Sequence, residues 1–146
     1  MDTRELRIGN YIQYFGNVAQ VEGIVNESNG FGLQLNGGDF ASINSNSLEP
    51  IPLTEEWLLK FGFTSEGEGC EAWLDLKNEI ENNKVQLRTW VNFECFQEYN
   101  GTAFFMLENY EGDDYTTIIP RKFKYVHQLQ NLYFALTREE LTIKTK

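Results

Sequence analysis

The chain has 146 residues, a formal net charge of −10 and 41% hydrophobic residues. This length fits one domain or two very small ones, and the apolar content excludes an intrinsically disordered chain. The acidic balance disfavours general nucleic-acid binding, and no apolar run approaches the roughly 18 residues that a membrane-spanning helix needs.

The first third of the chain is predicted to be all-β, because short apolar runs alternate with glycine and asparagine turns. The pairs Asn29-Gly30 and Asn36-Gly37 favour hairpins, since both residue types tolerate positive φ angles. Five short strands are predicted at residues 11–15, 18–25, 31–35, 40–43 and 48–51. Because closure removes exposed strand edges, this pattern predicts a small closed or half-closed SH3-like β-barrel over residues 1–53.

A short helix is predicted directly after this unit. The segment Pro50–Pro52 ends the strands, and Thr54 is expected to cap a helix that carries two glutamates in its first turn. Gly62 can adopt the left-handed conformation that closes a helix C-terminus. The apolar side chains of Trp57, Leu58 and Phe61 are expected to face a core.

Residues 71–119 show the period of two that is typical of an antiparallel meander. Val85 and Leu87 begin an apolar series that has one gap, at Thr89. Strands are predicted at residues 72–76, 85–95, 103–107 and 115–119. These form a four-stranded antiparallel sheet.

The last predicted element is an amphipathic helix over residues 125–136, which should cover the apolar face of that sheet. The fold class is therefore α+β, with one unit at residues 1–53 and a second at residues 54–146. Two arrangements fit this pattern: the units form separate cores, or they share one.

Three segments carry a resemblance to a known family. They are LRIGNY (6–11), PIPLTEEWLLKFGF (50–63), and KYVHQLQNLYFALT with EEL (124–137, 139–141). The chain resembles a family of small uncharacterised proteins carried by gut-type anaerobic bacteria and their prophages or mobile elements. The resemblance implies no activity, cofactor or catalytic residue. Arg138 stands where that family usually has a glycine, so we expect the helix to end through a capping box of Thr137 and Glu140, which opens a short final turn.

Few residues suggest chemistry. Cys70 and Cys95 form no CxxC pair, so we expect reduced thiols and no metal site or cofactor, in a cytoplasmic protein. His127 is the only histidine, and no nucleophile motif accompanies it. We expect no enzyme, although a cryptic active site around His127 with nearby carboxylates is one alternative.

Aromatic residues of the predicted meander point to a protein-interaction module instead. Trp90, Phe96 and Phe104 are expected on the face opposite the core, where uncovered rings would form a substantial apolar patch. Either the N-terminal barrel covers them, or a second copy or another protein does. The hypothesis is a non-catalytic interaction module that acts as an accessory protein of a phage or mobile element.

A basic segment supports an alternative function. Residues 121–146 carry six basic and two acidic side chains, which reverses the sign of the preceding chain. A nucleic-acid-associated role would depend on Arg121, Lys122 and Lys124, and the binding would weaken steeply with salt.

Overall fold

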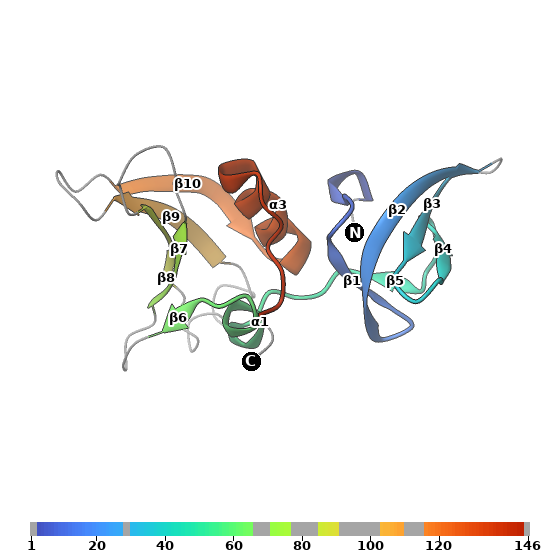
Figure 1. Ribbon diagram of the computed structural model, residues 1–146, viewed down its shortest axis with the longest axis horizontal. Coiled ribbons are helices and arrows are strands. Elements are labelled where there is room, and N and C mark those ends of the chain that lie inside the picture. The colour runs from blue at the N-terminus through green and yellow to red at the C-terminus, as the bar shows by residue number, and fades with distance from the viewer. Residues whose placement is uncertain are drawn as a thin grey trace.

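Two antiparallel sheets and a C-terminal helix make up an α+β fold (Figure 1), as predicted. The computed structural model describes residues 3–27, 30–65, 71–76, 85–90, 103–109 and 116–144. The C-terminal helix α3 (Val126–Thr137) lies between the two sheets, and the 3-10 helix η1 (Thr3–Glu5) lies beside it. None of the helices in these ranges is long and apolar enough to cross a membrane.

The N-terminal sheet has five strands in the order β4-β3-β2-β1-β5. They are β1 (Tyr11–Tyr14), β2 (Asn17–Glu27), β3 (Gly30–Leu35), β4 (Phe40–Ser42) and β5 (Leu48–Glu49). The sheet is open within the described residues, because β4 and β5 form its two edges and do not pair with each other. No closed barrel is found, and edge strands of three and two residues offer few backbone groups that could close one.

Strand β2 contains one irregularity that decides which residues face the core. Val21 pairs with Leu35 and Gly23 pairs with Gln34, so Glu22 is an extra residue without a counterpart on β3. Such a β-bulge reverses the alternation of side chains beyond it.

The second sheet has the order β10-β9-β8-β7-β6. Its strands are β6 (Thr64–Ser65), β7 (Glu71–Leu76), β8 (Val85–Trp90), β9 (Ala103–Asn109) and β10 (Thr116–Phe123). The predicted strands are confirmed as antiparallel neighbours where the structure describes them, and the two-residue strand β6 is an addition. Thr89, the gap in the apolar series, is buried and pairs with Phe105 on the core face.

Strand β10 continues past the predicted end at Ile119. Pro120 lies between Ile118 and Lys122, where the register with β9 shifts. A proline cannot donate to a ladder, and it is tolerated at a bulge on an edge strand, which β10 is. The strand therefore continues through the proline, which lies at this irregularity.

The short helix α1 (Glu55–Lys60) confirms the predicted start and stop. The Thr54 hydroxyl accepts a hydrogen bond from the Trp57 backbone N–H at 3.4 Å. At the other end Gly62 has φ 86°, and the Phe63 N–H donates to the Leu58 carbonyl at 3.0 Å. This pairing is the Schellman closure of a helix C-terminus.

The end of α3 differs from the prediction. Arg138 itself adopts the left-handed conformation, with φ 63° and ψ 12°, and its N–H donates to the Phe134 carbonyl at 2.8 Å. The Thr137 hydroxyl instead donates to the Tyr133 carbonyl and accepts from the Glu139 N–H. No helical turn follows over residues 138–144, so the predicted capping box of Thr137 and Glu140 is wrong.

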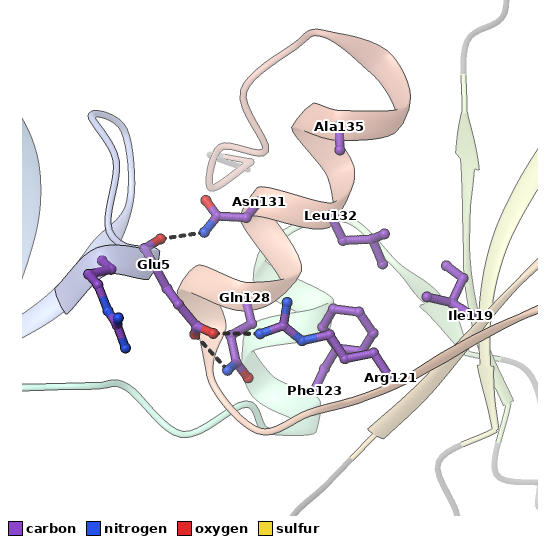
Figure 2. A pocket seen from close by; sticks show the side chains of 9 residues that line it. Glu5, Ile119, Arg121, Phe123, Gln128, Asn131, Leu132 and Ala135 are labelled. Carbon is purple, nitrogen blue, oxygen red and sulfur yellow. Dashed lines mark hydrogen bonds and ion pairs between the residues drawn. The ribbon is translucent and has the colours of Figure 1, made fainter. Parts of the chain in front are cut away.

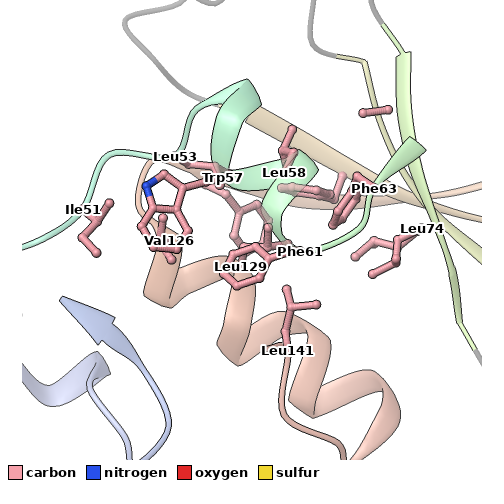
Figure 3. Close-up of a cluster of buried hydrophobic side chains, with 14 of the residues drawn as sticks. Ile51, Leu53, Trp57, Leu58, Phe61, Phe63, Leu74, Val126, Leu129 and Leu141 are labelled. Atoms are coloured by element: carbon pink, nitrogen blue, oxygen red, sulfur yellow. The ribbon is translucent and has the colours of Figure 1, made fainter. Parts of the chain in front are cut away.

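Buried apolar side chains form two clusters. The larger one joins α1 and α3 to the second sheet (Figure 3) and includes Leu58, Phe61, Phe105 and Leu129. The smaller one lies within the N-terminal sheet and includes Ile12, Val21, Leu33 and Leu35. Tyr11 of β1 packs against the larger cluster, with its ring centroid 5.8 Å from that of Trp57. The division of the chain near residue 53 stays a prediction.

Candidate functional site

Polar side chains of α3 join the N-terminal segment to the rest of the molecule, and we call this region the junction (residues 5–11, 121–131 and 140–141). Gln130 is a fully buried member of it. The Gln130 Oε1 atom accepts from the Tyr11 N–H at 2.8 Å, and Nε2 donates to the carbonyls of Gly9 at 3.0 Å and Leu141 at 3.1 Å. One side chain thus holds β1, α3 and the C-terminal segment together.

Glu5 of η1 is the charged centre of the junction (Figure 2). Its Oε1 atom accepts from Arg121 Nη2 at 2.5 Å, and its Oε2 atom accepts from Gln128 Nε2 at 2.9 Å. Its backbone carbonyl accepts from Asn131 Nδ2 at 2.6 Å. The hydrogen bond from Gln128 lowers the pKa of Glu5, with a further contribution from Arg121, although partial burial opposes them.

His127 lies deep in the same region, with a side chain that is only 1% exposed. Its Nε2 atom is 3.5 Å from Glu5 Oε2, and its ring stacks on Tyr125 at 5.7 Å between centroids. Burial lowers the pKa of His127, although the Glu5 carboxylate opposes this effect. Neither ring nitrogen has a hydrogen-bond partner within the described part of the chain. A buried neutral imidazole without access to a substrate offers no support for a catalytic role.

The three segments that carry the sequence resemblance meet around the start of α3, at the junction and directly beside it. Pro52 forms a β-bridge with Tyr125, and the Val126 N–H donates to the Ile51 carbonyl at 2.9 Å. Arg7 forms an ion pair with Glu140. These segments therefore build one structural unit around α3.

The structure does not gather the three predicted cations into one patch. Arg121 is bound to Glu5, and Lys124 Nζ lies 5.5 Å from the centroid of the Tyr125 ring. Lys122 follows Arg121 in β10, where successive side chains point to opposite faces. One of the three cations thus has a carboxylate partner within the protein, and the nucleic-acid alternative stays a prediction.

The predicted interaction aromatics lie outside what the structure describes. Phe96 is in a range that is not described, and only the backbones of Trp90 in β8 and Phe104 in β9 are described. Cys70 and Cys95 also lie outside the described residues. Among the residues that are described, no group of three histidine, cysteine, aspartate or glutamate side chains could hold a metal ion.

A different apolar surface appears on the N-terminal sheet. We call Ile24, Phe31 and Ile43 the distal apolar surface. Ile24 pairs with the buried Leu33, so it lies on the core face, yet it is 44% exposed. Phe31 is 56% exposed, and its carbonyl accepts from the Ile43 N–H at 3.1 Å. The core face thus continues past the core into solvent across neighbouring strands.

Sequence reasoning placed these residues in strands but missed the surface. Phe40 shows why composition alone cannot find it. This ring is 43% exposed, but it pairs with Gln34 on the opposite face and packs over Gly32. Only the register distinguishes the two phenylalanines.

Comparisons of the chain with family models, curated proteins and solved structures give no match. The resemblance to the bacterial and prophage family therefore stays a prediction.

Proposed function

We propose that this protein is a non-catalytic protein-interaction module that docks through the distal apolar surface. The observation that carries the proposal is that Ile24 and Phe31 extend the core face of the sheet into solvent. A phenylalanine buries roughly 150 to 250 Å² when it is covered, so a partner gains considerable apolar contact here. Contiguous exposed apolar side chains are a common mark of interaction sites.

We further infer that the N-terminal sheet has an SH3-like architecture. The strand order β4-β3-β2-β1-β5, with a long β2 shared by both halves of the sheet, supports an SH3-like architecture. The resemblance supports an accessory role for a phage or mobile element in the cytoplasm. The partner is another protein or a second copy of this chain.

Photo-cross-linking at single positions tests the proposal. p-Benzoylphenylalanine replaces Phe31 in one variant and Phe40 in the matched control, because both are exposed phenylalanines of neighbouring strands on opposite faces. Irradiation of the purified protein and of host-cell extract should give a discrete adduct from position 31. Its mass identifies either a dimer of the 17.0 kDa chain or a complex with another protein.

The control decides how the adduct is interpreted. Position 40 should give no discrete adduct. No adduct from position 31 in either sample, or equal adducts from both positions, would contradict docking through the distal apolar surface.

A further inference from the structure

A cleft of about 420 Å³ opens at the junction, between η1, α3 and β10 (Figure 2). This volume falls within the range of about 300 to 1,000 Å³ that is usual for small-molecule sites. Four of the lining residues are apolar: Ile119, Phe123, Leu132 and Ala135. The others are polar or charged: Arg4, Glu5, Arg121, Gln128 and Asn131. The cleft is therefore suited to a ligand with one apolar and one polar part.

Most hydrogen-bonding groups of the polar lining residues are already engaged within the protein. Both carboxylate oxygens of Glu5 accept hydrogen bonds. Gln128 accepts from the backbone N–H groups of residues 124 and 125 and donates to Glu5. Asn131 donates to the Glu5 carbonyl and accepts from Asn10 Nδ2 at 3.0 Å. Gln128 and Asn131 therefore hold Glu5, which in turn binds Arg121, and these three side chains have little capacity left for a ligand.

Arg121 is the polar side chain that can still form hydrogen bonds with a ligand, and its guanidinium can only donate them. A guanidinium carries five N–H donors, and Arg121 uses Nη2 for Glu5 while its side chain stays 57% exposed. Arg4 also lines the cleft. A ligand group that accepts hydrogen bonds fits best, and a negatively charged acceptor forms the strongest hydrogen bonds with a guanidinium.

We propose that the cleft binds a small amphipathic carboxylate. Its aliphatic part lies against Leu132, Ile119 and Phe123, and its carboxylate accepts hydrogen bonds from Arg121. A guanidinium and a carboxylate form parallel, charge-assisted hydrogen bonds, which are stronger than those between neutral groups. This binding activity is separate from docking at the distal apolar surface, because the two sites share no residue.

An NMR titration of the ¹⁵N-labelled protein with sodium octanoate tests the proposal. Saturable shifts are expected for the amides of Arg121, Leu132 and Ala135. Acetate, which lacks the aliphatic chain, and octylamine, which reverses the charge, serve as matched probes, and both should bind at least about tenfold more weakly. R121Q should weaken octanoate binding about tenfold, as loss of a charge-assisted hydrogen bond does.

Two helix variants provide the positional control. Ala135 lines the cleft, whereas the adjacent Leu136 does not, and both side chains are exposed. A135E should weaken octanoate binding about fivefold or more by repulsion, and L136E should leave it within about twofold. Melting curves verify that the variants fold. No saturable shift, equal affinity for octylamine, or equal weakening by both glutamates would overturn the proposal.

Discussion

Replacing Gln130 by methionine tests how strongly the junction stabilises the fold. Methionine keeps the length of the side chain but removes both the acceptor and the donors of the amide. The Gly9 carbonyl retains a hydrogen bond from Gln20 Nε2 at 3.1 Å. The Tyr11 N–H and the Leu141 carbonyl lose the partner that Gln130 provides. Two backbone groups are thus left unpaired.

The expected loss in the free energy of unfolding follows from these two unpaired backbone groups. A buried polar group without a partner costs about 1 to 3 kcal/mol, which gives about 2 to 6 kcal/mol for the pair. Tyr11 is only partly buried, so water can reach its N–H more readily, and we expect about 3 kcal/mol. Urea denaturation followed by tryptophan fluorescence measures this loss. Hydrogen exchange at the Tyr11 amide should accelerate in Q130M.

The matched control is Q34M, because Gln34 is an exposed glutamine of β3. This variant should unfold within about 0.5 kcal/mol of the parent protein, as surface substitutions usually do. If Q130M also stayed within that margin, or if Tyr11 exchange were unchanged, the junction would not hold the two parts of the molecule as argued.

Two further predictions concern α3. The pKa of His127 is below its ordinary value of 6.5, so the unfolded chain takes up the proton first, and stability should fall as pH decreases from about 6.5 toward the folded pKa. In H127Q, the urea midpoint should not show this decline. Glu5 causes a separate loss of stability in both proteins, which begins only below its ordinary pKa of 4.5. Parallel profiles of urea midpoint against pH for the two proteins above pH 4.5 would refute the assignment of the decline to His127. R138G should raise the free energy of unfolding by about 0.5 to 1 kcal/mol. The backbone strain of Arg138 that the glycine relieves is larger than the conformational entropy that the glycine adds to the unfolded chain. A lower melting temperature for R138G would contradict this account.

Local signals in the sequence were sufficient for the elements that depend on neighbouring residues. Thr54 and Gly62 mark the two ends of α1, and the period of two predicts the core face of β8. Each of these features needs only residues a few positions apart. Arg138 is the exception, because its left-handed backbone is strained and the surrounding chain holds it in place.

The junction could not be predicted, because its partners lie far apart in the sequence. Gln130 and Tyr11 are 119 residues apart, and Glu5 and Gln128 are 123 apart. Glutamine and asparagine on a helix give no distinctive pattern, since most such residues face solvent. For a related reason the sequence left open whether the barrel closes: closure depends on the pairing of two distant edge strands.

The extra residue in β2 has a consequence for how this chain can evolve. Deleting Glu22 would restore regular pairing with β3 and leave Ile24 opposite Leu33 on the core face, because Glu22 is the residue that has no counterpart. Pairing Glu22 with Gln34 would instead place Ile24 opposite Gly32, on the Phe40 side of the sheet, and Val25 would replace it on the core face. Loss of the Glu22 codon would thus preserve the binding surface, whereas a one-residue slip in the pairing would redraw it without changing a single apolar residue.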